Sequence, residues 1–434
     1  MTPSTSRRQF LSQLTRSAAA LPFLANWQAL AASARKQTKI TDIRTMLLQG
    51  PRTYTLVKIE TDAGISGIAE AYGSPGLGVR EEIHGLREFF IGLDPIQIDR
   101  LYTRFRYTDG SAHAQQRAMS GIEMALWDLA GKLLEVPTHA LLGGKFRDRV
   151  RLYDHSQPRD FFDKSACRDW AQALREQPNG ITMHKFSPMR TNPNDDPGRD
   201  RSNRVYSRQE LRRFRQAVEN CREALGFDHD LLVGCHWQFD LRSAIEMAQA
   251  LEAVKPVFFE DPLPVAYSES WRRLVDASPV PICTGENWMR RAEALPFVTH
   301  AAIDVLHPDL RNSGGFLETK RLADLADLYF LPMANHNTGS IVNGMATIHC
   351  AATIRDYLAC ETVFFRRDWM DDVIVHDRPL CENGFVTVPD KPGLGIELDP
   401  DVVRAHLAPG ETWWDDPPSI PRPTRQAAPP ITSP

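Results

Sequence analysis

The chain has 434 residues and a nearly balanced charge, with 51 Lys and Arg against 55 Asp and Glu and a formal net charge of −4. Hydrophobic residues make up 42% and charged residues 24%, a composition typical of a globular protein large enough for two domains. Neither this balance nor any Lys/Arg run favours nucleic acid as a partner. Apart from the N-terminus, no apolar run reaches the roughly 18 residues that a membrane span needs.

The N-terminus predicts export. Arg7 and Arg8 precede an apolar, Ala-rich stretch from Ala18 to Ala31, and Ala32-Ser33-Ala34 then offers small residues for cleavage. These three features are typical of a signal peptide of the twin-arginine (Tat) route, with an ordinary amphipathic helix as the alternative. We therefore expect residues 1–34 to be removed and the mature protein to be periplasmic or secreted.

Cysteine usage argues against a disulfide framework. The chain has seven cysteines, an odd number, and no two of them stand at C-x-x-C spacing. This speaks against both a structural zinc site and a disulfide-rich scaffold. We expect mostly buried free thiols, with one bridge as an option after export.

Residues 39–149 are predicted to form a small α+β domain. The segment Tyr54–Glu60 alternates in hydrophobicity as a strand does, and Asp62–Gly64 marks a turn. From about Arg80 to Lys132 the pattern becomes helical, with an apolar stripe near its end. Strands followed by helices over this length indicate a separate, smaller domain.

From Val150 onward, short apolar runs alternate with amphipathic helices. The eight runs cover Val150–Asp154, Ile181–Phe186, Leu231–His236, Pro256–Glu260, Val280–Thr284, Ala302–Leu306, Tyr329–Ala334 and Leu358–Glu361. Eight strand–helix units predict a closed (β/α) barrel over residues 150–384. A doubly wound open sheet is the alternative, but no Gly-x-Gly-x-x-Gly follows the first run. Asp240 is the expected N-cap of one barrel helix, and a Pro-rich tail occupies residues 413–434.

Polar side chains occur where these runs end. They are Lys185, His236, Glu260, Glu286, Asp309, His336 and Glu361. From position 234 onward, successive strand-end positions are 23 to 27 residues apart, which is one strand–helix unit each. Each residue alone has a structural explanation, such as an ordinary loop carboxylate. Because the carboxyl ends of barrel strands meet at one rim, where barrel enzymes build active sites, the joint spacing predicts a single site.

Several motifs resemble the mandelate racemase and muconate lactonizing enzyme branch of the enolase superfamily. They are Met124–Leu134, Leu141–Gly144, Phe259–Pro264, Thr284–Glu286, Pro308–Asp309 with Gly314–Gly315, and Pro392–Glu397. The resemblance extends from about Ile40 to Leu407. It implies an α/β fold in which a (β/α) barrel, a modified TIM barrel, carries an N-terminal α+β capping domain that residues 385–412 complete. It also implies a homo-oligomer that acts on a small-molecule carboxylate.

The resemblance further implies a metal ion and an acid–base pair. Glu260 and Glu286 match two carboxylate ligands of Mg²⁺, with Mn²⁺ or another divalent ion as alternatives. Asp309 and His336 match an Asp–His dyad in which the carboxylate orients the imidazole that moves a proton.

Two more residues match polar groups of the family's site. Glu361 matches a hydrogen-bond donor to the substrate carboxylate, and Lys185 matches the first lysine of a Lys-x-Lys pair. The proton next to a carboxylate is very weakly acidic, so the enediolate that forms on its removal needs a metal charge and preorganised donors. The residue types are those that such chemistry requires.

Two departures from the family pattern bear on the subgroup. Ser187 replaces the second lysine. His236 is expected on the same strand face as position 234. It resembles the histidine of acid-sugar dehydratases that acts as the acid and protonates the leaving hydroxide. Gly234 stands where the family has a metal-binding Asp. Two carboxylates alone would hold Mg²⁺ weakly unless His236, Cys235 or substrate oxygens complete the coordination.

We therefore expect a Mg²⁺-assisted lyase that dehydrates an acid sugar, an aldonate or a uronate, to a 2-keto-3-deoxy acid. A racemase or epimerase of a 2-hydroxy acid, using His336 against Lys185 or His236, is one alternative. A non-catalytic sugar-acid-binding homologue is another, because Gly234 lacks the metal-binding side chain. Specificity is expected from the loops at 48–54, 72–79 and 189–206.

Overall fold

The computed structural model describes residues 38–73, 78–106, 113–188, 202–362, 369–377 and 379–416, together with Asp196, Gly198 and Asp200. The predicted export signal, most of the polar loop 189–206 and the tail beyond residue 416 lie outside these described residues. Among the residues described, no helix combines the length and the apolar character needed to cross a bilayer. All seven cysteines are buried and none is bridged to another.

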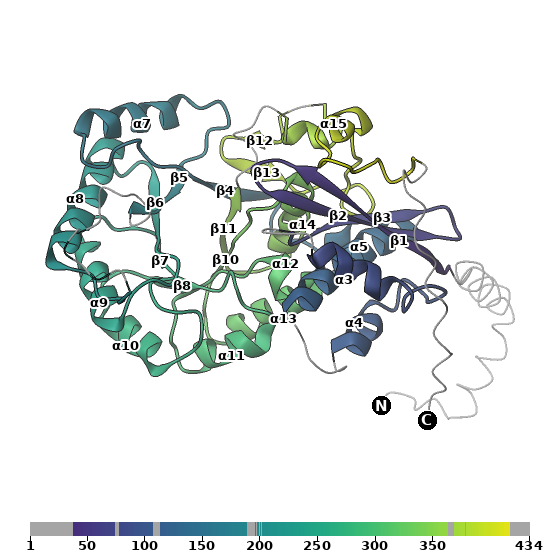
Figure 1. Ribbon diagram of the computed structural model, residues 1–434, viewed down its shortest axis with the longest axis horizontal. Coiled ribbons are helices and arrows are strands. Elements are labelled where there is room, and N and C mark those ends of the chain that lie inside the picture. Colours follow the sequence, from purple (N-terminus) through teal and green to yellow (C-terminus); the bar gives the residue numbers. More distant parts are fainter. Residues whose placement is uncertain are drawn as a thin grey trace, which may run out of the picture.

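An antiparallel sheet and a group of helices form the N-terminal domain (Figure 1). The sheet has the order β1 (Ile40–Gln49), β2 (Thr53–Thr61), β3 (Ser66–Ala71), and the helices are α3 (Gly78–Arg87), α4 (Ile98–Arg106), α5 (His113–Leu133) and α6 (Thr138–Leu141). The segment expected to be helical from Arg80 to Lys132 is thus three helices. Gly92, with a φ of 78°, and Pro95 end the first helical stretch before α4 begins.

Helix α5 lies directly on β3, and glycine at two positions allows this approach. A Cβ at Gly67 would stand 2.2 Å from the carbonyl oxygen of Ala125, and one at Gly121 would stand 2.6 Å from the Cβ of Ala71. Both distances are far inside van der Waals contact, so any side chain would push helix and sheet apart.

Eight parallel strands close into a barrel, as predicted. They are β4 (Arg149–His155), β5 (Met183–Phe186), β6 (Asp230–Gly234), β7 (Phe259–Glu260), β8 (Ile282–Thr284), β9 (Val305–Leu306), β10 (Met333–Asn335) and β11 (Tyr357–Thr362). Neighbours in sequence are neighbours in the sheet, and β11 pairs with β4 to complete the circle. Several strands are shorter than the apolar runs in the sequence, β7 and β9 having two residues each.

Helices cover the outside of the barrel (Figure 1). They are α7 (Lys164–Glu176), α8 (Arg208–Leu225), α9 (Leu241–Ala250), α10 (Glu269–Ala277), α11 (Arg291–Thr299), α13 (Gly315–Asp327) and α14 (Ile341–Ala352). The short α12 (Leu310–Ser313) lies instead between the barrel and α5 of the N-terminal domain (Figure 1). The predicted N-cap is confirmed, because the Asp240 side chain accepts hydrogen bonds from the backbone N–H groups of Arg242 and Ser243.

Each strand contributes one side chain to the barrel interior. The buried cluster there consists of Tyr153, Met183, Leu232, Phe258, Cys283, Val305, Ala334 and Ala359, of which Phe258 directly precedes its strand. Because side chains alternate along a strand, these residues fill the barrel while their neighbours pack against the helices. The interior is therefore a packed core, and chemistry is confined to the strand ends.

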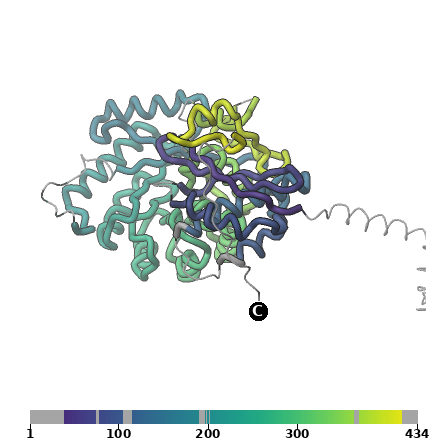
Figure 2. Tube along the Cα trace, turned by 45° about the vertical axis from the view of Figure 1, so that its right-hand side comes forward, coloured from purple at the N-terminus to yellow at the C-terminus, as the bar shows by residue number. Residues whose placement is uncertain are grey.

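After the barrel the chain returns to the N-terminal domain. The hairpin of β12 (Cys381–Glu382) and β13 (Phe385–Thr387) pairs with β4, and the short helices η3 (Asp371–Val373) and α15 (Pro400–Ala405) flank it in sequence. Leu407 then forms a bridge to Leu48 in β1, and the N–H of Leu394 donates to Asp128 Oδ1 in α5 at 2.7 Å. In Figures 1 and 2 this C-terminal segment lies against the first strands of the sheet.

Candidate active site

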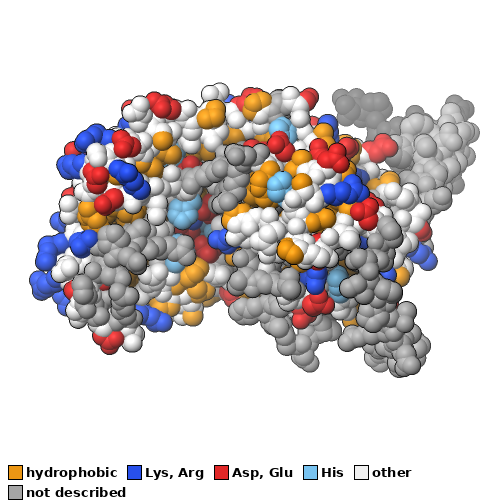
Figure 3. Space-filling view, turned by 45° about the horizontal axis from the view of Figure 1, so that its top comes forward, with side chains coloured by type: hydrophobic (Ala, Val, Ile, Leu, Met, Phe, Trp, Pro, Cys, Tyr) orange, Lys and Arg blue, Asp and Glu red, His pale blue; other side chains and the backbone are white. Residues whose placement is uncertain are grey.

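Six of the seven predicted site residues converge at the carboxyl ends of the barrel strands. Lys185 lies in β5, Glu260 ends β7, Glu286 and Asp309 follow β8 and β9, His336 directly follows β10, and Glu361 lies in β11. Histidine and acidic side chains gather in a hollow over the barrel half of the molecule (Figure 3). Ion-pair distances connect the six into one cluster. The spacing in the sequence thus predicted a real cluster of side chains.

Lys185 is the centre of a buried charge cluster. Its Nζ lies 3.0 Å from Glu260 Oε2 and 2.8 Å from Glu361 Oε1, and all three side chains are almost fully buried. Burial alone would lower the pKa of Lys185 and raise the pKa of each glutamate, but their mutual attraction prevails. The pKa of Lys185 is raised, that of Glu260 lies well below its usual value, and that of Glu361 falls to about 2. In this arrangement Glu361 accepts hydrogen bonds, so the donor role predicted for it requires prior protonation.

The Asp309–His336 pair has the geometry of an acid–base dyad. His336 Nδ1 lies 2.8 Å from Asp309 Oδ2, and its Nε2 lies 3.5 Å from Glu286 Oε2 and 3.8 Å from Glu361 Oε2. Asp309 therefore turns the free ring nitrogen toward the carboxylate cluster. Burial would lower the pKa of His336, but the carboxylates of Glu286, Glu361 and Asp309 raise it to about 10. Burial likewise opposes ionisation of Asp309, yet Arg311 holds the pKa of that carboxyl below its usual value.

Arg311 and Glu70 hold the dyad in place, and neither was predicted. Arg311 Nη2 donates to Asp309 Oδ2 at 2.7 Å, and its Nη1 donates to Glu70 Oε1, in strand β3 of the N-terminal domain, at 2.8 Å. Ser340, the N-cap of α14, donates its N–H to Glu70 Oε2 at 2.8 Å. Arg311 stands two residues after Asp309, which was a usable signal. Glu70 gave none, because the contact joins residues 241 apart in sequence.

Three side chains are arranged so that they could hold a divalent cation. One ligand atom from each of Glu260, Glu286 and His307 lies within 4.8 Å of the others. Burial raises the pKa of Glu286, and the charge of Glu260 adds to this while His336 opposes it, as expected where carboxylates lie close together in a buried site. His307 Nδ1 is buried and makes no hydrogen bond. The donor set thus fits a divalent cation and includes a histidine to which the sequence assigned no role.

The expected strand orientation of His236 is wrong. Strand β6 ends at Gly234, and His236 and Trp237 have φ values of 59° and 60°, in the left-handed region. Two successive left-handed residues turn the chain, so His236 does not follow Gly234 along one strand face. His236 is partly exposed, and its charge still contributes, after burial and nearer cations, to the pKa of Glu260. Gly234 does face the site, since a Cβ there would lie 3.0 Å from Glu260 Oε2.

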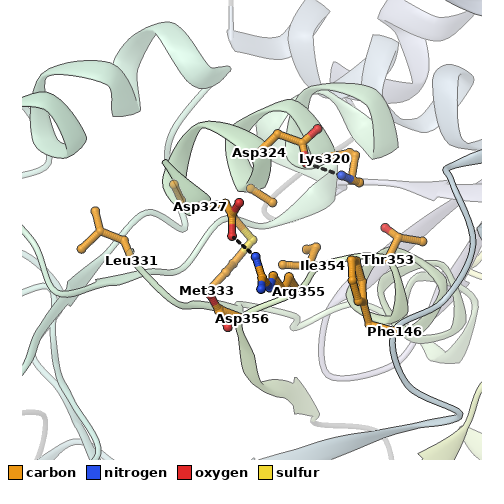
Figure 4. A pocket seen from close by; sticks show the side chains of 12 residues that line it. Phe146, Lys320, Asp324, Asp327, Leu331, Met333, Thr353, Ile354, Arg355 and Asp356 are labelled. Atoms are coloured by element: carbon orange, nitrogen blue, oxygen red, sulfur yellow. Dashed lines mark hydrogen bonds and ion pairs between the residues drawn. The ribbon is translucent and has the colours of Figure 1, made fainter. Parts of the chain in front are cut away.

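A separate pocket lies at the opposite end of the barrel (Figure 4). Its lining includes Met333 and Asp356, at the start of β10 and just before β11, with Asp327 and Arg355 forming an ion pair of 3.9 Å. Its lining contains no histidine, and two of its three aspartates, Asp324 and Asp327, form ion pairs with Lys320 and Arg355. The strand-end cluster is the better candidate for the active site, because its titratable groups are buried and shift one another's pKa.

A closed parallel barrel beneath an α+β cap, with carboxylates and an Asp–His dyad at the strand ends, defines a class of barrel enzymes. The profile of the mandelate racemase/muconate lactonizing enzyme N-terminal domain matches residues 36–143, and that of the enolase C-terminal domain-like family matches residues 167–402. The chain belongs to the mandelate racemase/muconate lactonizing enzyme family of the enolase superfamily, as its motifs predicted.

Relatives within this family are acid-sugar dehydratases. The chain is 36% identical to the D-xylonate dehydratase of Haloferax volcanii over 88% of its own length and 92% of that protein. It is 28% identical to the D-galactonate dehydratase of Xanthomonas oryzae pv. oryzae, over 84% and 94% of the two chains. Among solved structures, it matches a mandelate racemase/muconate lactonizing enzyme-like protein from Rubrobacter xylanophilus with a TM-score of 0.81 and 29% identity, covering 87% of this chain and 99% of that one. The predicted similarity to dehydratases of the family is confirmed.

Proposed function

We propose that this enzyme dehydrates an acid sugar, an aldonate or a uronate, to a 2-keto-3-deoxy acid. In this reaction the proton on the carbon next to the carboxylate is removed and the hydroxyl on the following carbon leaves as water. The resulting enol then takes up a proton at that second carbon and becomes the ketone. The observation that carries the proposal is the Asp309–His336 dyad, whose Nε2 faces the Glu286 and Glu361 carboxylates at 3.5 and 3.8 Å.

We assign the stabilisation of negative charge on the substrate to a divalent cation that the crowded carboxylates would hold. Glu260 and Glu286 would hold a divalent ion, Mg²⁺ or Mn²⁺, which when bound would stabilise negative charge on the substrate carboxylate. Lys185 is positioned to donate from the same side, because its Nζ stands between Glu260 and Glu361. Such preorganised donors lower the barrier to removal of a weakly acidic proton.

His336 is the proposed base and His236 the proposed acid. Asp309 accepts from Nδ1 of His336, which fixes the ring and directs Nε2 toward the site. Against the effect of burial, the carboxylates of Glu286 and Glu361 raise the pKa of His336 to about 10, so Nε2 would take the α-proton once a divalent ion held by Glu260 and Glu286 offsets that negative charge. His236 stands at the partly exposed rim, where it could protonate the departing hydroxide and where water can leave. Dehydration needs one base and one acid, and the two histidines differ in exposure, His336 being buried and His236 partly exposed.

The test measures exchange of the α-proton and loss of water in the same experiment. The protein is incubated with Mg²⁺ and a panel of aldonates and uronates in deuterated buffer, and the products are examined by proton NMR. Dehydration gives the signals of a new 3-deoxy carbon and a keto acid for at least one substrate. Deuterium uptake without those signals would indicate epimerisation, and neither change with any acid would indicate a binding protein. Either of the last two results would overturn the proposed dehydration.

We also propose that the protein is exported by the Tat route and works as a homo-oligomer in the periplasm or outside the cell. The twin arginines support export, and β1 begins at Ile40, after the expected cleavage position. Exposed apolar side chains at the end of α13, Leu328 and Phe330 above all, support association of copies. Sedimentation of the mature protein tests the oligomer, since a monomer at micromolar concentration would contradict it.

A further inference from the structure

Gly234 leaves the proposed metal site one ligand short. The residue ends β6 and faces Glu260 and Ser187, whose Oε2 and Oγ would lie 3.0 and 3.3 Å from a Cβ at position 234. The hydroxyl oxygen of Ser187 is buried and makes no hydrogen bond. No side chain from β6 can therefore reach the ion, and Glu260 and Glu286 are two carboxylates where hard divalent ions prefer more protein or water oxygens.

His307 lies on the other side of Glu260, after β9. It is fully buried, and its Nδ1 lies 2.9 Å from Glu260 Oε1 without making a hydrogen bond there. Two ligands at neighbouring positions of an octahedral ion, each about 2.1 Å from it, stand about 3 Å apart. The observed separation of 2.9 Å therefore matches that of two ligands of one ion.

Tyr153 offers Nε2 of His307 a partner that can leave Nδ1 unprotonated. The Tyr153 hydroxyl donates to Glu361 Oε2 at 3.3 Å and lies 2.5 Å from His307 Nε2. A carboxylate only accepts, and a phenol has a single proton. Where that proton is directed at Glu361, the hydrogen between Tyr153 and His307 belongs to Nε2. Nδ1 then carries a lone pair, and its distance of 2.9 Å from Glu260 Oε1 places two electron-rich atoms close together, an arrangement that a cation bound by both would stabilise.

We propose that His307 Nδ1 is the third protein ligand of the divalent ion and takes the place of the side chain that Gly234 lacks. The Tyr153–Glu361 contact is then the outer support that fixes the tautomer of a metal-binding histidine. Imidazole suits first-row transition ions better than Mg²⁺, so the site prefers Mn²⁺ and its later neighbours to Mg²⁺. The inference rests on the proposed metal-assisted function and makes its ligand set specific.

The first experiment reads the ligand directly and needs no variant. Mn²⁺ is added to the substrate-free native protein, and electron spin echo modulation shows whether a ¹⁴N nucleus is bound to it. Protein labelled with ¹⁵N-histidine must show the corresponding change in that coupling. Detection of a histidine nitrogen that responds to the label supports the proposal. Mn²⁺ bound without any nitrogen coupling would overturn it, even if the protein dehydrates an acid sugar.

The second experiment identifies which histidine is bound. His307→Gln should lose the nitrogen coupling and weaken Mn²⁺ binding at least about tenfold, as measured by calorimetric titration, with circular dichroism as the check on folding. His236→Asn is the matched control and should keep the coupling. Loss of the coupling in His236→Asn, with its retention in His307→Gln, would assign the ligand to His236 instead.

A double variant tests the exchange of ligands. Gly234→Asp added to His307→Gln should restore divalent binding and reverse the preference, so that Mg²⁺ gains relative to Mn²⁺. If the native protein binds neither ion, the metal-assisted function fails together with this inference. If it binds Mn²⁺ through oxygen alone and remains a dehydratase, only this inference fails.

Discussion

Glu70 in the cap and Arg311 at the barrel rim form a buried ion pair of 2.8 Å. The same guanidinium holds Asp309 at 2.7 Å, and Asp309 holds His336 at 2.8 Å. A carboxylate of the N-terminal domain is thus connected through three contacts to the proposed base of the barrel. The position of the N-terminal domain on the barrel and the orientation of the His336 ring therefore depend on the same contacts.

Glu70→Gln should lower kcat more than it changes KM. Loss of the charge frees the Arg311 guanidinium to shift and with it Asp309, and misplacement of a reacting group by about 1 Å costs up to roughly 100-fold in rate. The thermal midpoint should also fall, because the buried guanidinium loses its ionic partner. Glu81→Gln, on an exposed face of the same domain, is the matched control and should leave both quantities unchanged. Unchanged kcat and KM in Glu70→Gln would show that the N-terminal domain does not position the base.

His336→Asn should abolish turnover and exchange of the α-proton while the protein stays folded. Loss of a general base costs about 10²–10⁴ in rate, and asparagine keeps a polar group near Asp309. Exchange in deuterated buffer, followed by proton NMR, measures the step itself and not only product formation. A variant that exchanges the α-proton at a near-native rate would assign the base to another residue.

The position of the candidate active site at the barrel rim could be predicted from the sequence because the barrel is built from repeated strand–helix units. Glu260 ends β7 and Glu286 lies just after the next strand, β8. Any chain that closes such a barrel brings these strand ends together. The spacing therefore carries three-dimensional information that single residues lack. Several paired strands, β7 and β9 among them, are shorter than the apolar runs, since pairing stops where the chain turns into the loops that carry the site.

The orientation of side chains, and contacts between residues far apart in the chain, could not be predicted from the sequence. His236 was expected to share a face with Gly234, but left-handed φ values at His236 and Trp237 redirect the chain, and no Gly or Pro marks that turn. His307 was visible two residues before Asp309, yet its relation to the metal site depends on the ring orientation. Such features arise from tertiary packing, which outweighs local preference at a functional site.

Arg7→Lys combined with Arg8→Lys should leave the protein in the cytoplasm with its first 34 residues attached. The Tat route requires the arginine pair, and lysine keeps the charge while changing the group that is recognised. Arg16→Lys, in the same segment, is the control and should be exported normally. Cell fractionation and the mass of the mature protein provide the measurements. Periplasmic, processed protein from the double variant would contradict the Tat prediction.

His349 is buried where α6, α14 and the returning C-terminal segment meet. Its Nε2 contacts the carbonyl oxygen of Leu394 at 3.1 Å, and its ring stacks on that of His139 with centroids 5.5 Å apart. Burial lowers the pKa of His349 to about 4, and the charges of His139 and Lys145 act in the same direction, against Asp390. The ring is therefore neutral in the folded protein at neutral pH and below it.

This neutrality predicts a loss of stability in mild acid. The unfolded chain binds a proton on His349 near pH 6.5 whereas the folded protein does so only near pH 4, so stability falls as the pH drops through that window. The slope from this one group is on the order of 1 kcal/mol per pH unit. His349→Gln should be less stable at pH 7, because the packing is disturbed, but should lose less stability than the native protein between pH 7 and pH 5. His300→Gln, at an exposed helix end, should keep the native slope. Chemical unfolding at both pH values measures the difference, and equal slopes for native protein and His349→Gln would show that this histidine does not link protonation to unfolding.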